Sequence, residues 1–186
     1  MRHSETICRK LEASLVRWRL RNCDLVGPEP RLFGRPYVRN EGRIEIGAGF
    51  VLSSVPVRSH MVTGPNGALR IGNNVRISHG ASISAHVEIV IEDDVVIGPF
   101  AMLLDSDYHE SGQRDSPGKA KPIRIGRGVR LGSGVVVLRG AVIGDGAIIE
   151  PNSVVNRYVP NAVRAAGVPA RPVRLDVPRG NEMTLS

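Results

Sequence analysis

The chain has 186 residues, enough for one domain with a modest terminal addition, and only 4% of them are aromatic. This argues against a conventional globular core, which uses more Phe, Tyr and Trp, and fits a narrow core of small aliphatic side chains. The net charge of +7 favours anionic partners, but the basic residues are scattered without an aromatic stacking platform, so nucleic acid is not the expected partner.

The only cysteines are Cys8 and Cys23, which make neither a disulfide framework nor a metal-type spacing. No apolar run approaches the roughly 18 residues of a membrane span, and the N-terminus lacks an apolar signal-peptide core. We therefore expect a reducing compartment and predict a cytoplasmic protein.

Residues 4–22 are predicted to form an α-helix. An apolar stripe runs along it at i, i+4, i+8 and i+11, and consists of Ile7, Leu11, Leu15 and Trp18. Two interpretations stay open: the helix caps the open end of a repeat structure, or its basic, amphipathic surface contacts a membrane. The breaker sequence 27–30 (GPEP) then ends a first unit, residues 1–30.

A small aliphatic residue returns at every sixth position in the second half of the chain. The series is Ile125, Leu131, Val137, Ile143, Ile149 and Val155. Neither an α-helix nor a flat strand has this period, so it indicates short straight segments joined by corners, as in a parallel β-helix. Gly follows several of these residues, where we expect the backbone to bend.

Earlier repeats are less regular. The period begins near Ile44, breaks over 58–68, and slips by two after Ile89. We predict a β-helix of about five coils over residues 31–160, followed by a tail over 161–186.

One polar segment, residues 104–121 (LDSDYHESGQRDSPGKAK), interrupts the repeats and is predicted to be an extruded loop. His109 is its only histidine, and a neutral imidazole that titrates near working pH suits a general base. Asp105, Asp107 and Glu110 lie close enough in sequence to orient it, and Asp107 is preferred.

The hexads, the loop sequence DSDYH and the tail AAGVPARPVR together resemble the left-handed β-helix (hexapeptide-repeat) acyltransferases, over about residues 70–175. Within that family the chain is most similar to the galactoside, maltose and polysaccharide O-acetyltransferases. The resemblance implies an all-β left-handed parallel β-helix with an N-terminal helix and a loop that carries the catalytic His109. It also implies acetyl-CoA as co-substrate and a homotrimer with active sites between subunits.

Site residues follow from the same resemblance. Those matched to coenzyme A contacts are Ser133, Asn156, Arg157, Arg171 and Arg174. Those placed at the acceptor are Ser78, His79 and His86. Three departures stand out: Arg130 replaces an aromatic, Pro151 lacks an N–H for the cofactor, and Ser78 and His86 replace Asn and Asp. The last departure weighs against a galactoside- or maltose-type acceptor.

The predicted function is acetyl transfer from acetyl-CoA to a hydroxyl of a sugar or polysaccharide precursor, with no metal. An N-acetyltransferase acting on an amino sugar and a non-catalytic scaffold remain alternatives. A γ-type carbonic anhydrase needs an HxxxxH pair, whereas His79 and His86 are seven apart. His3 and His60 are interpreted as surface residues.

Overall fold

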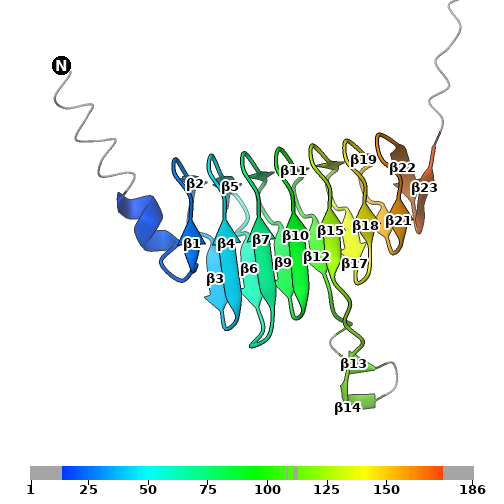
Figure 1. Cartoon of the computed structure of the whole chain (residues 1–186), viewed down its shortest axis with the longest axis horizontal. Helices are drawn as coiled ribbons and strands as arrows, with labels where there is room; N and C mark the ends of the chain where they lie inside the picture. The colour runs from blue at the N-terminus through cyan, green and yellow to red at the C-terminus, as the bar shows by residue number, and fades with distance from the viewer. Residues whose placement is uncertain (1–13, 108, 111–112, 174–186) are drawn as a thin grey trace, which may run out of the picture.

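The computed structural model describes residues 14–107, 109–110 and 113–173, with the side chains of 109–110 and 113–117 outside the description. Its strands follow one another in a row of triangular coils, with a short helix at one end and a projecting arm near the other (Figure 1). Each complete coil contributes one strand to each of three sheets, which we call sheets A, B and C, and the last coil ends after its strand in sheet B.

The strand bounds are as follows. Sheet A contains β1 (Leu25–Val26), β4 (Arg43–Ile46), β7 (Ala68–Ile71), β10 (Glu88–Ile91), β15 (Ile123–Ile125), β18 (Val142–Ile143) and β21 (Tyr158–Val159). Sheet B contains β2 (Arg31–Phe33), β5 (Val51–Ser53), β8 (Arg76–Ile77), β11 (Val96–Ile97), β16 (Arg130–Leu131), β19 (Ile148–Ile149), β22 (Arg164–Gly167) and the antiparallel β23 (Ala170–Pro172). Sheet C contains β3 (Tyr37–Asn40), β6 (His60–Thr63), β9 (Ser82–Ala85), β12 (Met102–Leu104), β17 (Val136–Leu138) and β20 (Val154–Val155).

The chain visits sheets A, B and C in turn, so the corners form three columns, named A/B, B/C and C/A. The predicted fold class, an all-β left-handed parallel β-helix, is confirmed. Sheets of seven, eight and six strands give more coils than the five predicted. The difference arises mainly in the first coil, β1 to β3, whose residues carry no hexad.

The core is a stack of aliphatic side chains. All six residues of the clean hexad series are at most 2% exposed. The glycines that follow them have a reason other than the expected bend. A Cβ on Gly132 would lie 2.6 Å from the Pro151 nitrogen, and one on Gly144 would lie 2.6 Å from the Asn161 nitrogen. Neither glycine has a positive φ, so close stacking of coils, not backbone curvature, requires glycine here.

Residues 14–19 are helical and lie against the first coil. Val16 and Leu20, an i, i+4 pair, join the hydrophobic core, while Leu15 is 45% and Trp18 50% exposed. Capping of the open end is thus confirmed for the described turn, but by a different face from the predicted stripe. Ile7 and Leu11 lie outside the described residues. Within the described ranges, no helix combines the length and apolar character of a membrane span.

Candidate active site

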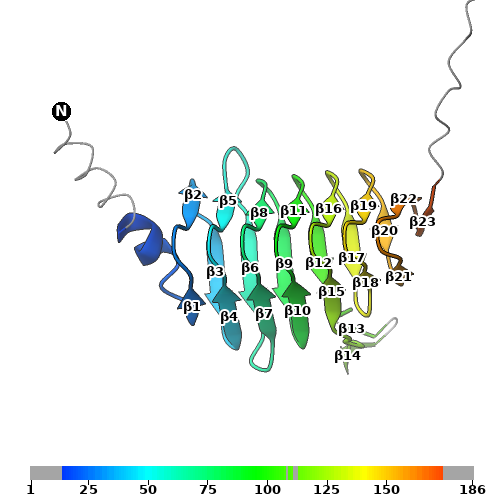
Figure 2. The same ribbon diagram turned by 45° about the horizontal axis from the view of Figure 1, so that its top comes forward.

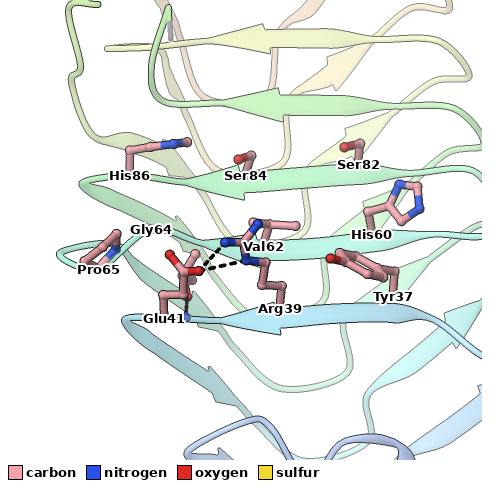
Figure 3. A pocket seen from close by; sticks show the side chains of 11 residues that line it. Tyr37, Arg39, Glu41, His60, Val62, Gly64, Pro65, Ser82, Ser84 and His86 are labelled. Carbon is pink, nitrogen blue, oxygen red and sulfur yellow. Dashed lines mark hydrogen bonds and ion pairs between the residues drawn. The ribbon is translucent and has the colours of Figure 1, made fainter. Parts of the chain in front are cut away.

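A pocket of about 480 Å³ lies on the outer face of sheet C, over its first three strands. Parallel pairing aligns Tyr37, His60 and Ser82 in one row across β3, β6 and β9. A second row, two residues along each strand, consists of Arg39, Val62 and Ser84. Figure 3 shows these two rows side by side, with His86 at the edge where the chain leaves the sheet. Strand alternation places all these side chains on one face.

The pocket has a mixed polar and apolar lining, and its strongest charge is compensated. Arg39 donates through Nε to Glu41 Oε1 at 2.8 Å, and the hydrogen bond to Glu41 raises the pKa of Arg39 (Figure 3). The rings of Tyr37 and His60 meet edge to face with centroids 5.4 Å apart. An aromatic edge, hydroxyls and an imidazole suit a polyhydroxylated ligand better than a strongly anionic one.

His86 stands at a C/A corner that a buried carboxylate holds in place. Asp105, with a side chain 0% exposed, accepts hydrogen bonds from three consecutive backbone N–H groups. The distances are 2.7 Å from His86, 2.7 Å from Val87 and 2.9 Å from Glu88. The Nδ1 atom of His86 lies 3.8 Å from the same carboxylate. Asp105, a sequence candidate for orienting His109, is therefore engaged with the corner of the preceding coil.

The arm, residues 105–121, begins directly at this carboxylate. Its two chain segments run antiparallel at the root: Lys121 N donates to Asp105 O at 2.9 Å, and Asp107 N donates to Lys119 O at 3.0 Å. An isolated bridge between Ser106 and Ala120 lies between these bonds. The backbone then forms the antiparallel pair β13 (His109–Glu110) and β14 (Gln113–Pro117). The interrupting segment is thus a hairpin arm with a hydrogen-bonded neck, visible below the coils in Figure 1.

His109 lies in β13, and its side chain is outside the described part, as is that of Glu110. The Asp107 carboxylate faces Arg139, with Oδ2 2.5 Å from Nε. Arg139 belongs to the C/A corner of the next coil, so Asp107 ties the neck to that coil. Asp107 precedes His109 by two residues in the same segment of the arm.

Within one copy of the protein, the three acceptor residues suggested by the sequence do not lie together. Ser78 and His79 lie in the B/C corner before β9, whereas His86 follows β9 at the C/A corner. Ser78 O accepts from Ser59 Oγ at 3.2 Å, and the His79 ring meets Phe100 edge to face at 5.3 Å. The two groups therefore occupy opposite edges of sheet C.

The predicted cofactor residues divide in the same way. Ser133 is exposed at a B/C corner, and Asn156 and Arg157 are exposed at the C/A corner after β20. Arg171, exposed in β23, donates to its neighbour's carbonyl, Ala170 O, at 2.9 Å. Arg174 lies outside the described residues. Arg157 and Arg171 enter no ion pair within the described ranges, so their charges are available to an anion.

Of the pocket residues, the sequence pointed only to His86, and it did not single out Tyr37, Arg39 or His60. Tyr37 and Arg39 lie in the first coil, which has no hexad, and His60 lies where the period breaks. The remaining signal was the alternation over 60–63 (HMVT), in which Met61 and Thr63 are buried. Over the described residues, no three His, Cys, Asp or Glu side chains gather as a metal site would require.

Comparison with known proteins agrees with the fold. The family described as bacterial transferase hexapeptide (six repeats) matches residues 122–157. No protein of curated function gives a significant sequence match. A hexapeptide-repeat acetyltransferase of Vibrio cholerae O1 biovar eltor, solved with acetyl coenzyme A, superposes with a TM-score of 0.64 at 22% identity, over 88% of this chain and 76% of that one.

Two further solved structures are similar. A galactoside acetyltransferase in complex with coenzyme A gives a TM-score of 0.59 at 26% identity, over 84% of this chain and 66% of that one. An N-acyltransferase mutant from Bacillus cereus, in complex with dTDP and coenzyme A, gives 0.68 at 18% identity, over 82% and 84%. The predicted resemblance to the hexapeptide-repeat acyltransferases is confirmed.

Proposed function

We propose that the protein is an acetyl-CoA-dependent O-acetyltransferase that acts on a hydroxyl of a sugar or polysaccharide precursor. The observation that carries the proposal is the Asp105 corner. Asp105 stands at the root of the arm that bears His109, and its buried carboxylate fixes the edge of the sheet C pocket at His86. A base on an arm beside a pocket suited to hydroxyl groups is the minimum that acyl transfer to an alcohol requires.

The divided site residues support a homotrimer. Around a threefold axis parallel to the solenoid, with sheet C facing the neighbouring copies, the C/A corners of one copy face the B/C corners of the next. The pocket over the first strands of sheet C would then open into the space that the three copies enclose. His86, Asn156 and the arm would then meet Ser78 and Ser133 of a neighbour. The outer face of sheet C turns apolar in its later coils, through Met102, Leu104, Val136, Leu138 and Val154. Such a patch favours burial against another surface.

Coenzyme A fits the cleft between these two corner columns. Asn156 and Arg157 would hold phosphates, Ser133 would contact the pantetheine arm, and Arg171 with Arg174 would approach the adenosine end. Arg157 and Arg171 are exposed and pair with no carboxylate of the described residues, which agrees with that role. When bound, acetyl-CoA supplies the acetyl group as an activated thioester.

In the proposed mechanism His109 accepts the proton of the acceptor hydroxyl as its oxygen attacks the thioester carbonyl. Asp107, itself fixed by Arg139, holds the imidazole through its other nitrogen. A backbone N–H on a rigid corner stabilises the negative charge that develops on the carbonyl oxygen. The acetyl group passes directly to the acceptor. The protonated His109 then donates its proton to the thiolate of coenzyme A.

An amino-sugar N-acetyltransferase would use the same base and groove, so O-transfer is the first of two chemistries to test. We place the protein in the cytoplasm. The non-catalytic scaffold is the alternative that fails to bind coenzyme A.

Thermal unfolding with and without about 100 Kd of coenzyme A tests the proposal, because ligand at that level stabilises by about 2.7 kcal/mol. We expect a shift in wild type that shrinks in Arg171→Ala/Arg174→Ala but not in the control Arg31→Ala/Arg76→Ala. His109→Ala should keep the shift and lose about 10²–10⁴-fold in kcat. Absence of a shift in wild type would overturn the proposal.

A further inference from the structure

The helical end of the solenoid presents an exposed surface that the proposed chemistry does not use. We call it the end surface: Leu15, Arg17, Trp18, Arg21 and Arg35, all exposed. It covers the outer side of the helical turn and the B/C corner of the first coil. The Arg21 and Arg35 guanidinium carbons lie 4.6 and 5.5 Å from the Trp18 ring centroid. Figure 2 shows this turn at the extreme end of the row of coils.

The positive charge of this surface is not compensated by the protein. Residues 14–36 contain five arginines against two carboxylates, Asp24 and Glu29. Asp24 is occupied by Asn40 Nδ2 and Ile44 N, each at 2.8 Å, and these hydrogen bonds lower the pKa of its carboxyl group. None of the five arginines takes part in an ion pair within the described ranges.

Sheet A shows what compensation looks like in this protein. There the outward arginines Arg43, Arg70 and Arg124 alternate with Glu45 and Glu88 in a continuous ladder of ion pairs. That face needs no partner to balance its charge. The end surface, with a local excess of three positive charges, attracts an anionic one.

The apolar residues of the end surface decide between anionic partners. Leu15 and Trp18 belong to the predicted helix stripe, yet they face outward because Val16 and Leu20 make the contact with the core. A Trp side chain flanked by arginines is typical of a membrane interface, where the indole lies at the level of the lipid headgroups. Stacking on a nucleic acid base would use Trp18 but gives Leu15 nothing to contact.

From this combination we infer that the end surface docks on an anionic lipid bilayer. The inference rests on the proposed function in one respect, the trimer. A threefold axis parallel to the solenoid carries three end surfaces in one plane, all facing the same way, so three weak contacts act together. The arm projects from the side of the solenoid toward its other end, away from the end surface (Figure 1).

Flotation with lipid vesicles tests this inference on the full-length protein. We expect wild type to float with phosphatidylcholine vesicles that contain about 30% phosphatidylglycerol, and not with phosphatidylcholine alone. Arg17→Glu/Arg21→Glu should lower the bound fraction at least about tenfold, since charge near the surface dominates. The control Arg127→Glu/Arg130→Glu makes the same charge change at exposed arginines outside the end surface.

A second pair of variants tests insertion. Leu15→Ser/Trp18→Ser should release the protein from anionic vesicles, whereas Val142→Ser/Tyr158→Ser, at exposed positions of sheet A, should not. Equal losses in the two Arg→Glu pairs would overturn the inference, because binding would then reflect net charge alone. Equal losses in the two serine pairs would overturn it as well, because no apolar contact would then belong to the end surface. It would also be overturned if a single-stranded oligonucleotide bound through the end surface while anionic vesicles did not bind.

Coenzyme A shifts and solution mass, measured on the same preparations, separate the two hypotheses. If the trimer binds coenzyme A but floats with no vesicle, membrane docking is contradicted and the acetyltransferase proposal stands. Flotation without a coenzyme A shift supports docking and overturns the acetyltransferase.

Discussion

The buried carboxylate of Asp105 accepts the backbone N–H of His86 at 2.7 Å, although nineteen residues separate them in sequence. The bond joins two consecutive coils at the one corner where the chain leaves the solenoid. Asp105 also receives the next two N–H groups, so it closes the corner in the way that a helix cap satisfies the first amides of a helix. Several properties of the protein depend on this corner.

Asp105→Asn is expected to destabilise the fold by about 3 kcal/mol, because an amide nitrogen would face backbone donors in a fully buried site. The melting temperature should fall by roughly 6–12 °C for a chain of this size. Asp107→Asn, whose carboxylate is 42% exposed, is the matched control and should cost less than about 1 kcal/mol. Equal effects in a urea or thermal denaturation would contradict the assigned role.

The Asp107–Arg139 pair is expected to matter for catalysis more than for folding. Asp107→Asn and Arg139→Gln should each lower kcat, by about tenfold, with little change in KM for acetyl-CoA, because both changes loosen the arm rather than the cofactor groove. Steady-state kinetics with either variant provides the measurement. A rise in KM with kcat unchanged would place this pair in the cofactor site instead.

Tyr37 is expected to contribute to acceptor binding through its exposed ring beside His60. Tyr37→Ala should raise KM for the acceptor and leave the coenzyme A thermal shift intact. Tyr158→Ala, at an exposed tyrosine on sheet A, is the control. Unchanged acceptor kinetics in Tyr37→Ala would remove this pocket from the acceptor site.

The apolar half of sheet C is expected to mediate assembly. Leu138 pairs in register with Leu104, so Leu138→Glu introduces a charge at the middle of the patch. Light scattering should show the variant as a monomer with the circular dichroism of wild type. Val142→Glu, on sheet A, should remain a trimer; if Leu138→Glu does too, another face makes the interface.

Cys23 is expected to be unreactive in the native protein. Burial raises the pKa of its thiol to about 12, so at pH 8 almost none of it is thiolate. In a Cys8→Ser background, reaction with a thiol-specific disulfide reagent should be slow until denaturant is added. Rapid reaction of the native protein would show that the end of the solenoid opens readily.

The sequence predicted the coils best where one inward side chain per strand repeats without error, as from Ile125 to Val155. It failed in the first coil, because that coil is held by pairing with β4 to β6 and by Val16 and Leu20, not by a hexad of its own. A sequence period predicts which side chains are buried, but it does not predict strands that are stabilised mainly by pairing with a neighbouring strand.

The candidate site was predictable where it depends on local sequence, and not where it depends on contacts between coils. The polar interruption located the arm, and chemistry singled out His109 within it. The engagement of Asp105 with residues 86–88 was not predictable, since it depends on the stacking of two coils. Nor could sequence show that Ser78 and His86 occupy opposite edges of sheet C, because both flank the same short strand.

The neck of the arm has an evolutionary consequence. Main-chain hydrogen bonds between Asp105 and Lys121 and between Asp107 and Lys119 close the arm before its tip begins. Replacement of everything beyond the neck by a tight turn would leave every coil its contacts. A descendant of this gene can therefore lose its chemistry while its architecture persists, and can gain a new chemistry by exchanging a dozen residues. In such a lineage the tip of the arm and the coils of the solenoid can change independently of each other.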